Sequence, residues 1–322
     1  MESEAWDFGI AGSVPNVIAG QQGILTVGIN NDESATTEVV AEPGVTEWPP
    51  TELTPEIFAA TPKSTGELLL RQCLVAAGLD FNDDHVYLDQ QKPLMEKLVE
   101  EGDPRYACLW APNTYKYREA QPRAKVVCSG RTVDFPIYGG LMMREEWALN
   151  NKETAKKVLA AYLRGVSFMQ NLAVREEVLK LSDEYHKFTG NTLQKFALEE
   201  DLILRPLFNL DEQLVHLDRN FANDYTSDAD KHYILLEEFL FQQEVIDNKH
   251  EPKEYVTDEY MKLVSEDAEL RAFSYFSAAD FAAKGISTKV ASESGPNVSL
   301  IVGIVVAVVG VAAFVIAFFI MK

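Results

Sequence analysis

Basic residues are scarce in this chain of 322 residues, which has 29 Lys and Arg against 50 Asp and Glu and a formal charge of -21. Nucleic-acid binding relies on Lys and Arg to neutralise phosphates, so this charge excludes a nucleic-acid partner. An anionic lipid surface would repel the chain as well. The acidic residues are spread along the sequence, which is typical of a well-solvated surface.

Cysteine is also rare, and the three cysteines are Cys73, Cys108 and Cys128. No two of them form a Cys-x-x-Cys pair, and no His lies at zinc-ligand spacing from any of them, so we expect no metal site. Three is an odd number, and each cysteine lies in an apolar run. We therefore expect buried thiols and not a complete disulfide framework.

The first six residues are polar and show no signal peptide. The chain has one long uncharged apolar run, at residues 298–321. About 20 apolar residues span a bilayer as a helix, so this run predicts a transmembrane helix. Lys322 follows it and favours a cytoplasmic C-terminus, which puts the bulk of the chain on the extracytoplasmic or lumenal side. Residues 280–297 are rich in Ala, Ser, Lys and Gly and predict a linker.

Short strand-like runs alternate with helices over the first 140 residues. Residues 24–29 predict a buried strand, and residues 67–77 predict an amphipathic helix that Gly78 ends. This alternation is typical of a parallel or mixed sheet covered by helices. The chain is mostly helical after Asn150, and further helices are expected at residues 174–188, 192–200, 210–221, 230–246 and 256–264.

Five stretches carry a resemblance to a known family. They read, in chain order, WDFGIAGSVP, GINNDESATT, ATPKSTGELLLRQCLVAAGL, ACLWAPNTY and GGLMMREEWALNNKETAKKVLAAYLRG. Together they resemble the nitrate/sulfonate/taurine branch of the periplasmic solute-binding proteins, which also includes relatives involved in thiamine-pyrimidine synthesis. The resemblance covers residues 5–265.

The resemblance implies an α/β fold of the two-lobed periplasmic-binding-protein-like type (type II), with a hinge and a ligand cleft between the lobes, followed here by one C-terminal transmembrane helix. Residues 1–56 are expected to form the N-terminal part of the first lobe, and residues 57–138 the second lobe. Residues 139–279 would return to the first lobe, followed by the linker at 280–297 and the membrane helix at 298–321. Members of the family have two more strands and a helix before the first matching stretch, so the resemblance implies a truncated first lobe.

The expected ligand site lies at the carboxyl ends of the strands, where open α/β sheets bind their ligands. The loops there carry hydroxyl, amide and glycine groups, and exposed N–H groups at a helix start favour an anion. Ser64 and Thr65 are equally compatible with helix caps, and Trp110 with a core position. The expected ligand-binding residues are Gly12, Ser13, Asn31, Ser34, Thr36, Ser64, Thr65, Gly66, Trp110, Asn113 and Tyr138.

These features imply a membrane-anchored solute-binding protein that clamps a small anion, such as nitrate, a sulfonate or taurine, for ABC-type uptake or sensing with an ABC permease. A receptor or scaffold without a ligand is an open alternative. An enzyme like the thiamine-pyrimidine-synthesis relatives fits less well, because their cysteine-rich motif has no counterpart here and no His pairs with a plausible nucleophile. We therefore expect no catalytic residue and no cofactor.

Overall fold

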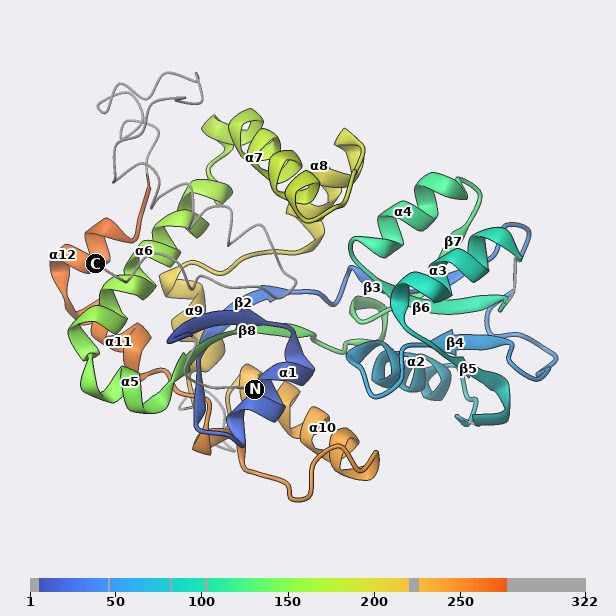
Figure 1. Cartoon of the computed structure of the whole chain (residues 1–322), viewed down its shortest axis with the longest axis horizontal. Helices are drawn as coiled ribbons and strands as arrows, with labels where there is room; N and C mark the ends of the chain where they lie inside the picture. Colours follow the sequence, from blue (N-terminus) through green and yellow to red (C-terminus); the bar gives the residue numbers. More distant parts are fainter. Residues whose placement is uncertain (1–5, 46, 82, 102–103, 220–225, 277–322) are drawn as a thin grey trace.

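The computed structural model describes residues 6–45, 47–81, 83–101, 104–219 and 226–276. They form two lobes side by side, each built on a β-sheet (Figure 1). The strands are β1 (Phe8–Ala11), β2 (Ile24–Asp32), β3 (Thr37–Ala41), β4 (Phe58–Ala60), β5 (Val86–Leu88), β6 (Tyr106–Trp110), β7 (Lys125–Ser129) and β8 (Tyr138–Arg144).

The helices are concentrated in the second half of the chain (Figure 1). The α-helices are α1 (Ser13–Gly20), α2 (Thr65–Ala76), α3 (Gln91–Glu100), α4 (Asn113–Ala120), α5 (Glu145–Asn150), α6 (Lys152–Gln170), α7 (Arg175–Phe188), α8 (Lys195–Leu204), α9 (Leu210–Leu217), α10 (Asp228–Gln242), α11 (Glu259–Glu266) and α12 (Ala268–Phe273). The short 3-10 helices are η1 (Asp83–His85), η2 (Arg131–Val133), η3 (Leu172–Val174) and η4 (Pro252–Glu254). The helices predicted beyond residue 170 are confirmed as α7 to α11, with ends that differ by at most four residues.

The first lobe is built on a sheet of three described strands in the order β1-β8-β2, with β8 antiparallel to both neighbours. Phe8 of β1 packs edge-on against Tyr162 of α6, with ring centroids 6.4 Å apart. The outer edge of β2 is covered by Gln213 of α9, whose amide accepts a hydrogen bond from the Ile29 N–H and donates one to the Ile29 carbonyl. The implied truncation of this lobe stays a prediction.

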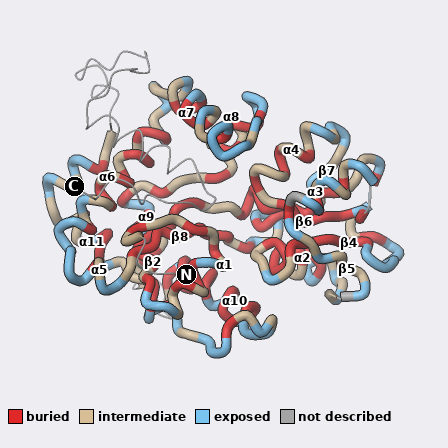
Figure 2. The backbone as a smooth tube through the Cα atoms, viewed as in Figure 1, coloured by how far each residue is buried: buried red, intermediate tan, exposed pale blue. Residues whose placement is uncertain are grey.

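The second lobe is built on five strands in the order β5-β4-β6-β3-β7. Strand β4 runs parallel to β5 and β6, whereas β3 runs antiparallel to β6 and β7. Successive residues of β3 face opposite sides, so Val39 packs in the core with Leu70 of α2 while Val40 packs with Leu94 of α3 and Tyr117 of α4. Both faces of this sheet are therefore covered by helices. In both lobes, buried residues lie along the strands of the sheet (Figure 2).

Strand β3 corrects one predicted boundary. We expected residues 1–56 to belong to the first lobe, but β3 pairs with β6 and β7 of the second sheet. The chain therefore enters the second lobe by Thr37, and the prediction is wrong for residues 37–41. The strand is buried on both faces, so its sequence shows no alternation of apolar and polar residues that would have marked it.

Two chain segments connect the lobes, at residues 32–37 and 129–138, and they hydrogen-bond to each other. The Glu33 N–H donates to the Ile137 carbonyl at 2.7 Å, and the Arg131 N–H donates to the Ser34 carbonyl at 2.9 Å. A Cβ at Gly130 would lie 2.9 Å from the Ser34 Cα, so the close approach of the two segments requires glycine there. We call these two segments the hinge.

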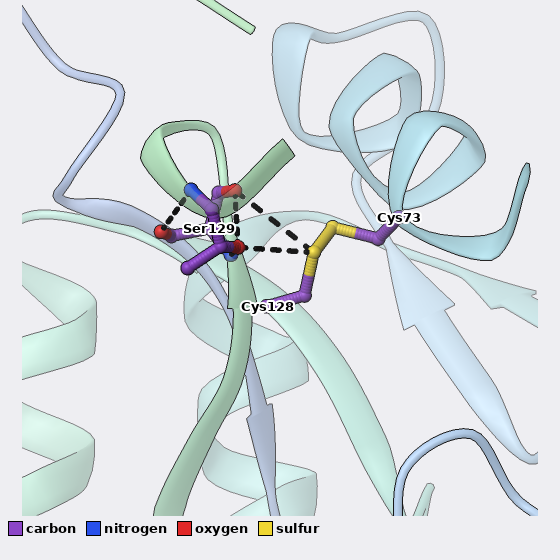
Figure 3. The surroundings of a disulfide bond; sticks show 4 residues. Cys73, Cys128 and Ser129 are labelled. Atoms are coloured by element: carbon purple, nitrogen blue, oxygen red, sulfur yellow. Dashed lines mark hydrogen bonds between the residues drawn. A yellow bond between two sulfur atoms is a disulfide. The ribbon is translucent and has the colours of Figure 1, made fainter. Parts of the chain in front are cut away.

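A disulfide joins Cys73 of α2 to Cys128 at the end of β7 (Figure 3). The two Cα atoms lie 6.2 Å apart, and the two residues are 55 positions apart in the sequence. The prediction of three thiols is therefore wrong, because spacing along the chain does not show which helix packs over which strand. Cys108 is free, and its burial in β6 raises the pKa of its thiol well above the ordinary value.

Within the described residues, no helix is both long enough and apolar enough to span a bilayer. The predicted linker at residues 280–297 and the predicted transmembrane helix at residues 298–321 lie outside the described residues.

Candidate ligand-binding site

Helix α1 begins directly after β1, at the carboxyl end of that strand. Gly12 is its N-cap residue, no side chain caps its first N–H groups, and its first turn contains no acidic residue. The Ser13 hydroxyl donates to the Tyr138 carbonyl at 2.8 Å, which ties the start of α1 to one hinge segment. A methyl group at Gly12 would meet no atom within 4 Å, so this helix start has space beside it.

Helix α4 has the same features in the second lobe. It begins after β6, its N-cap residue is Pro112, and it lacks both a side-chain cap and an acidic residue in its first turn. The Ala111 N–H donates to the Thr36 carbonyl at 3.2 Å, which ties this start to the other hinge segment. Asn113, the first residue of α4, is partly exposed.

Helix α2 differs, because its own side chains satisfy its N-terminus. The Ser64 hydroxyl accepts from the N–H groups of Gly66 and Glu67 at 3.1 and 3.2 Å. The buried Glu67 carboxylate accepts from the Lys63 N–H at 2.7 Å and pairs with Arg71 at 2.6 Å. Ser64 is thus a helix cap, and a carboxylate already occupies the position at which an external anion would bind. Thr65 is partly exposed beside it.

Trp110 lies at the carboxyl end of β6 with its six-membered ring against the first turn of α2. A Cβ at Gly66 would come within 3.1 Å of this ring, so Gly66 allows the contact. Gln91 accepts from the Trp110 N–H at 3.1 Å and donates to the Thr61 hydroxyl and the Cys108 carbonyl. These bonds hold the ends of β4 and β6 together beneath the partly exposed indole.

Asn31, Ser34 and Thr36 are fully or nearly buried, and their hydrogen bonds are internal. The Asn31 amide donates to Glu33 and accepts from Asn30. The Ser34 N–H donates to the Asp32 carboxylate at 2.7 Å, and the Thr36 hydroxyl donates to the Glu33 carbonyl. All three belong to the β2 end and the hinge, so they position the lobes.

Tyr138 is buried in an aromatic cluster with Phe208, His216 and His232, whose ring centroids lie 6.2, 5.7 and 5.5 Å from its own. Burial raises the pKa of Tyr138 and lowers the pKa of His232 to about 3, so both side chains are neutral at pH 7. The Tyr138 ring is thus a core side chain of the first lobe.

A contact between the lobes was not foreseen from the sequence: α8 packs on α4. Arg118 makes two hydrogen bonds to Glu200, at 3.0 and 2.8 Å. The Tyr115 hydroxyl donates to the Asp201 carboxylate at 3.0 Å. Apolar residues also pack in this contact, where Ala111 and Tyr115 form one buried cluster with Leu179, Leu193, Ala197 and Leu198.

The buried Arg205 connects this contact to the hinge. Its guanidinium donates to Asp201 at 3.2 Å and to Glu33 at 2.8 Å. Asp201 and Arg205 are four residues apart, which is the spacing of an ordinary ion pair on a helix. This spacing is the part of the arrangement that can be recognised in the sequence. Glu33 lies 172 residues away from Arg205, so the triad could not be predicted from the spacing of its residues.

No protein-family model matches the chain, and no curated protein matches it. The chain does match solved structures. The aliphatic sulphonate binding protein SsuA from Escherichia coli has a TM-score of 0.63 at 14% identity, covering 79% of this chain and 76% of that one. The nitrate-binding protein NrtA from Synechocystis PCC 6803 has a TM-score of 0.59 at 13% identity, covering 84% and 76%.

The fold is that of the periplasmic solute-binding proteins. A third structure of this fold, the putative sulfonate-binding protein SsuA from Methylobacillus flagellatus KT, has a TM-score of 0.60 at 16% identity and covers 83% of this chain and 77% of that one. The structural resemblance predicted from the five sequence stretches is therefore confirmed, and so is the periplasmic-binding-protein-like α/β fold.

Proposed function

We propose that this chain is a membrane-anchored solute-binding protein that clamps a small anion between its two lobes, for ABC-type uptake or sensing. The anion would be of the nitrate, sulfonate or taurine class. Two of the structures with this fold are named for sulfonate and nitrate binding, which supports this class of ligand.

The observation that carries the proposal is the pair of uncapped helix starts, α1 and α4. Each follows the carboxyl end of a strand, each comes from a different lobe, and each is tied to a hinge segment. Exposed N–H groups and the helix dipole at such a start attract anions. An anion bound to both starts would interact only with the closed arrangement and would therefore favour closure.

Side chains near these starts supply the rest of the proposed site. Ser13 and Asn113 are the first residues of α1 and α4. Thr65 is the first residue of α2, and its side chain is partly exposed. Trp110 offers an aromatic face at the end of β6, against which the apolar part of a sulfonate would pack. The ring lies on Gly66, so its position is set by packing before any ligand binds.

The proposed location is extracytoplasmic, with residues 298–321 as the membrane anchor and an ABC permease as partner. The Cys73–Cys128 disulfide supports this location, because disulfides persist mainly in oxidising compartments.

The test is a thermal-shift screen of the full chain in detergent with nitrate, bicarbonate, taurine and alkanesulfonates. A ligand at a hundred times its Kd stabilises the native state by about 2.7 kcal/mol. Gly12→Asp is the decisive variant, since its carboxylate would cap α1 and compete with the anion. We expect it to weaken binding about tenfold without lowering the melting temperature of the free protein.

Gly12→Ala is the matched control, because its methyl group meets no atom within 4 Å and carries no charge. It should bind as the unchanged chain does. Equal affinity of Gly12→Asp and Gly12→Ala for a ligand found in the screen would place the site elsewhere and contradict the proposal.

The contact of α8 with α4 favours a second candidate, a scaffold that keeps its lobes together without a ligand. Arg118 and Tyr115 join the lobes directly, through Glu200 and Asp201. A cooperative melt that no anion shifts, in a screen that also includes neutral osmolytes as controls, would favour the scaffold.

A further inference from the structure

His186 is a buried titratable side chain of the first lobe that the proposed ligand site does not use. It lies on α7 and is 7% exposed. Leu179 and Ser182 share its face of the helix, because the three residues are spaced three and four positions apart. Leu179 packs in one buried cluster with Ala111 and Tyr115 of the second lobe. This face of α7 is therefore turned toward the contact between the lobes.

The end of α7 is also bonded to α4 of the second lobe. The Asn191 N–H donates to the His186 carbonyl at 2.7 Å, and the Lys116 ammonium on α4 donates to the Asn191 side chain. Lys116 is therefore held near His186 by a contact that exists only while the lobes are together.

The surroundings of His186 disfavour its charged form. Burial lowers the pKa of its imidazole below the ordinary value of 6.5, and the cations Arg205 and Lys116 act in the same direction. The carboxylates Asp201 and Asp183 act in the opposite direction, but burial and the two cations outweigh them. Among these four charged groups, Lys116 alone comes from the second lobe.

Both carboxylates already have partners. Asp201 accepts from the Tyr115 hydroxyl at 3.0 Å and from Arg205 at 3.2 Å, and Asp183 pairs with Lys187 at 2.6 Å. The Nε2 atom of the imidazole is buried and has no hydrogen-bond partner among the described residues. Since a protonated imidazole carries an N–H on both nitrogens, its charge would be buried in this contact together with an unsatisfied donor.

We propose that His186 takes up a proton when the lobes part, so that acidification opens the contact between α4 and the pair of helices α7 and α8. Lys116 leaves His186 together with α4, and water replaces the second lobe beside the imidazole. Both changes stabilise the charged form, so the open arrangement binds the proton more tightly than the closed one. A proton that binds the open arrangement better shifts the balance toward it, whichever ligand the cleft takes.

The direction of the effect and its pH range follow from the lowered pKa of His186. Above pH 6.5 the imidazole is neutral in both arrangements, so this group does not affect the contact there. Below pH 6.5 the open arrangement takes up the proton and the closed one does not, so closure is lost as the pH falls toward the lowered pKa. One proton is linked to opening, so the ratio of open to closed chains rises by up to about tenfold per pH unit.

Glu38 responds to the same contact with the opposite sign. Burial raises the pKa of Glu38 to about 7, Arg118 on α4 lowers it, and the Glu200 carboxylate across the contact raises it. Parting of the lobes removes Glu200 and lowers this pKa, so acid favours closure through Glu38. The test is therefore made with chains that carry Glu38→Gln, in which this opposing response is absent.

The test measures the distance between two spin labels by pulsed electron paramagnetic resonance, in the full chain in detergent. One label is attached at Leu172→Cys of the first lobe and the other at Val126→Cys of the second, because these positions are 83% and 39% exposed. Between pH 7.5 and 5.5 we expect the population with the longer distance to rise about tenfold. His186→Gln should abolish this rise, whereas the matched control His85→Gln, on η1 of the second lobe, should leave it intact.

A second measurement follows the pKa of His186 itself, from the imidazole signal that disappears from the NMR spectrum in His186→Gln. In Arg118→Glu the new carboxylate repels Glu200 and parts the lobes, so the pKa of His186 should rise toward 6.5. The matched control Arg118→Lys keeps the attraction and should keep the lowered pKa.

An equal rise of the longer-distance population in His186→Gln would overturn the proposal. So would distances that do not change with pH, or a His186 pKa that is the same in Arg118→Glu and Arg118→Lys, because burial within the first lobe would then set that pKa.

Discussion

Glu38 provides the sharpest test of the electrostatics of the second lobe. It lies on β3 under α4 with 5% of its surface exposed, and its Oε2 has no hydrogen-bond partner among the described residues. Arg118 is the nearby cation, but both of its terminal nitrogens are bonded to Glu200. Burial therefore outweighs the attraction of Arg118 and raises the pKa of Glu38 from 4.5 to about 7.

The direction of the pH effect follows from this shift. The folded chain keeps the Glu38 proton up to about pH 7, whereas the unfolded chain releases it above pH 4.5. Stability from this group is therefore complete below pH 4.5 and is lost as the pH rises to 7. A shift of about 2.5 units corresponds to a loss of about 3 kcal/mol in the free energy of unfolding.

Glu38→Gln removes the titration and keeps the shape. We expect it to raise the free energy of unfolding by about 3 kcal/mol at pH 8 and to change it little at pH 4.5. Urea unfolding at both pH values measures this difference, with Glu42→Gln, directly after the end of β3, as the control. The reasoning is refuted if Glu38→Gln has the same effect at both pH values, or if it destabilises the protein at pH 8.

Two further changes test the contacts that hold each lobe and join the two. Reduction of the Cys73–Cys128 disulfide, which closes a loop of 55 residues, should lower the free energy of unfolding by about 4 kcal/mol. A Cys73→Ser/Cys128→Ser variant should be insensitive to reductant in the same urea titration, and a shift in it would show that another bond is being reduced. Arg118→Ala breaks a partly buried pair with Glu200, so it should cost about 1 kcal/mol. It should also enlarge the radius of gyration in small-angle scattering, and an unchanged radius would mean that this pair does not hold the lobes together.

The elements that the sequence predicted best are those with clear periodicity. The helices after residue 170 were located to within a few residues, because a half-buried helix repeats its apolar residues every three or four positions. Strand β3 was missed because it is buried on both faces and has no such pattern. The disulfide was missed for a different reason, since Cys73 and Cys128 become neighbours only when α2 packs over β7.

The candidate site shows the same limit at the level of single residues. A serine followed by Thr, Gly and Glu at a helix start fits both an anion site and a self-capped helix, and the Ser64 and Glu67 hydrogen bonds show that this start is self-capped. Conversely, the start of α1 is marked only by Gly12, which has no side chain to indicate a function. Whether a helix start is free depends on where the neighbouring side chains point, and the sequence does not show that.

The buried triad of Arg205, Asp201 and Glu33 indicates where the lobes would separate. Asp201 lies on α8, Arg205 directly follows it, and Glu33 lies at the first-lobe end of the hinge, so their ion pairs persist if α4 moves away. The bonds that must break include those of Tyr115, Lys116, Arg118 and Glu119 on α4, to Asp201, Asn191, Glu200 and Gln194. A hydrogen bond to a charged group makes a net contribution of about 1 to 3 kcal/mol to the stability of such a contact. A ligand with a Kd between about 1 mM and 1 µM binds with about 4 to 8 kcal/mol, which is of the same order as this contact, so a ligand that interacts with both lobes shifts the balance between its open and closed arrangements.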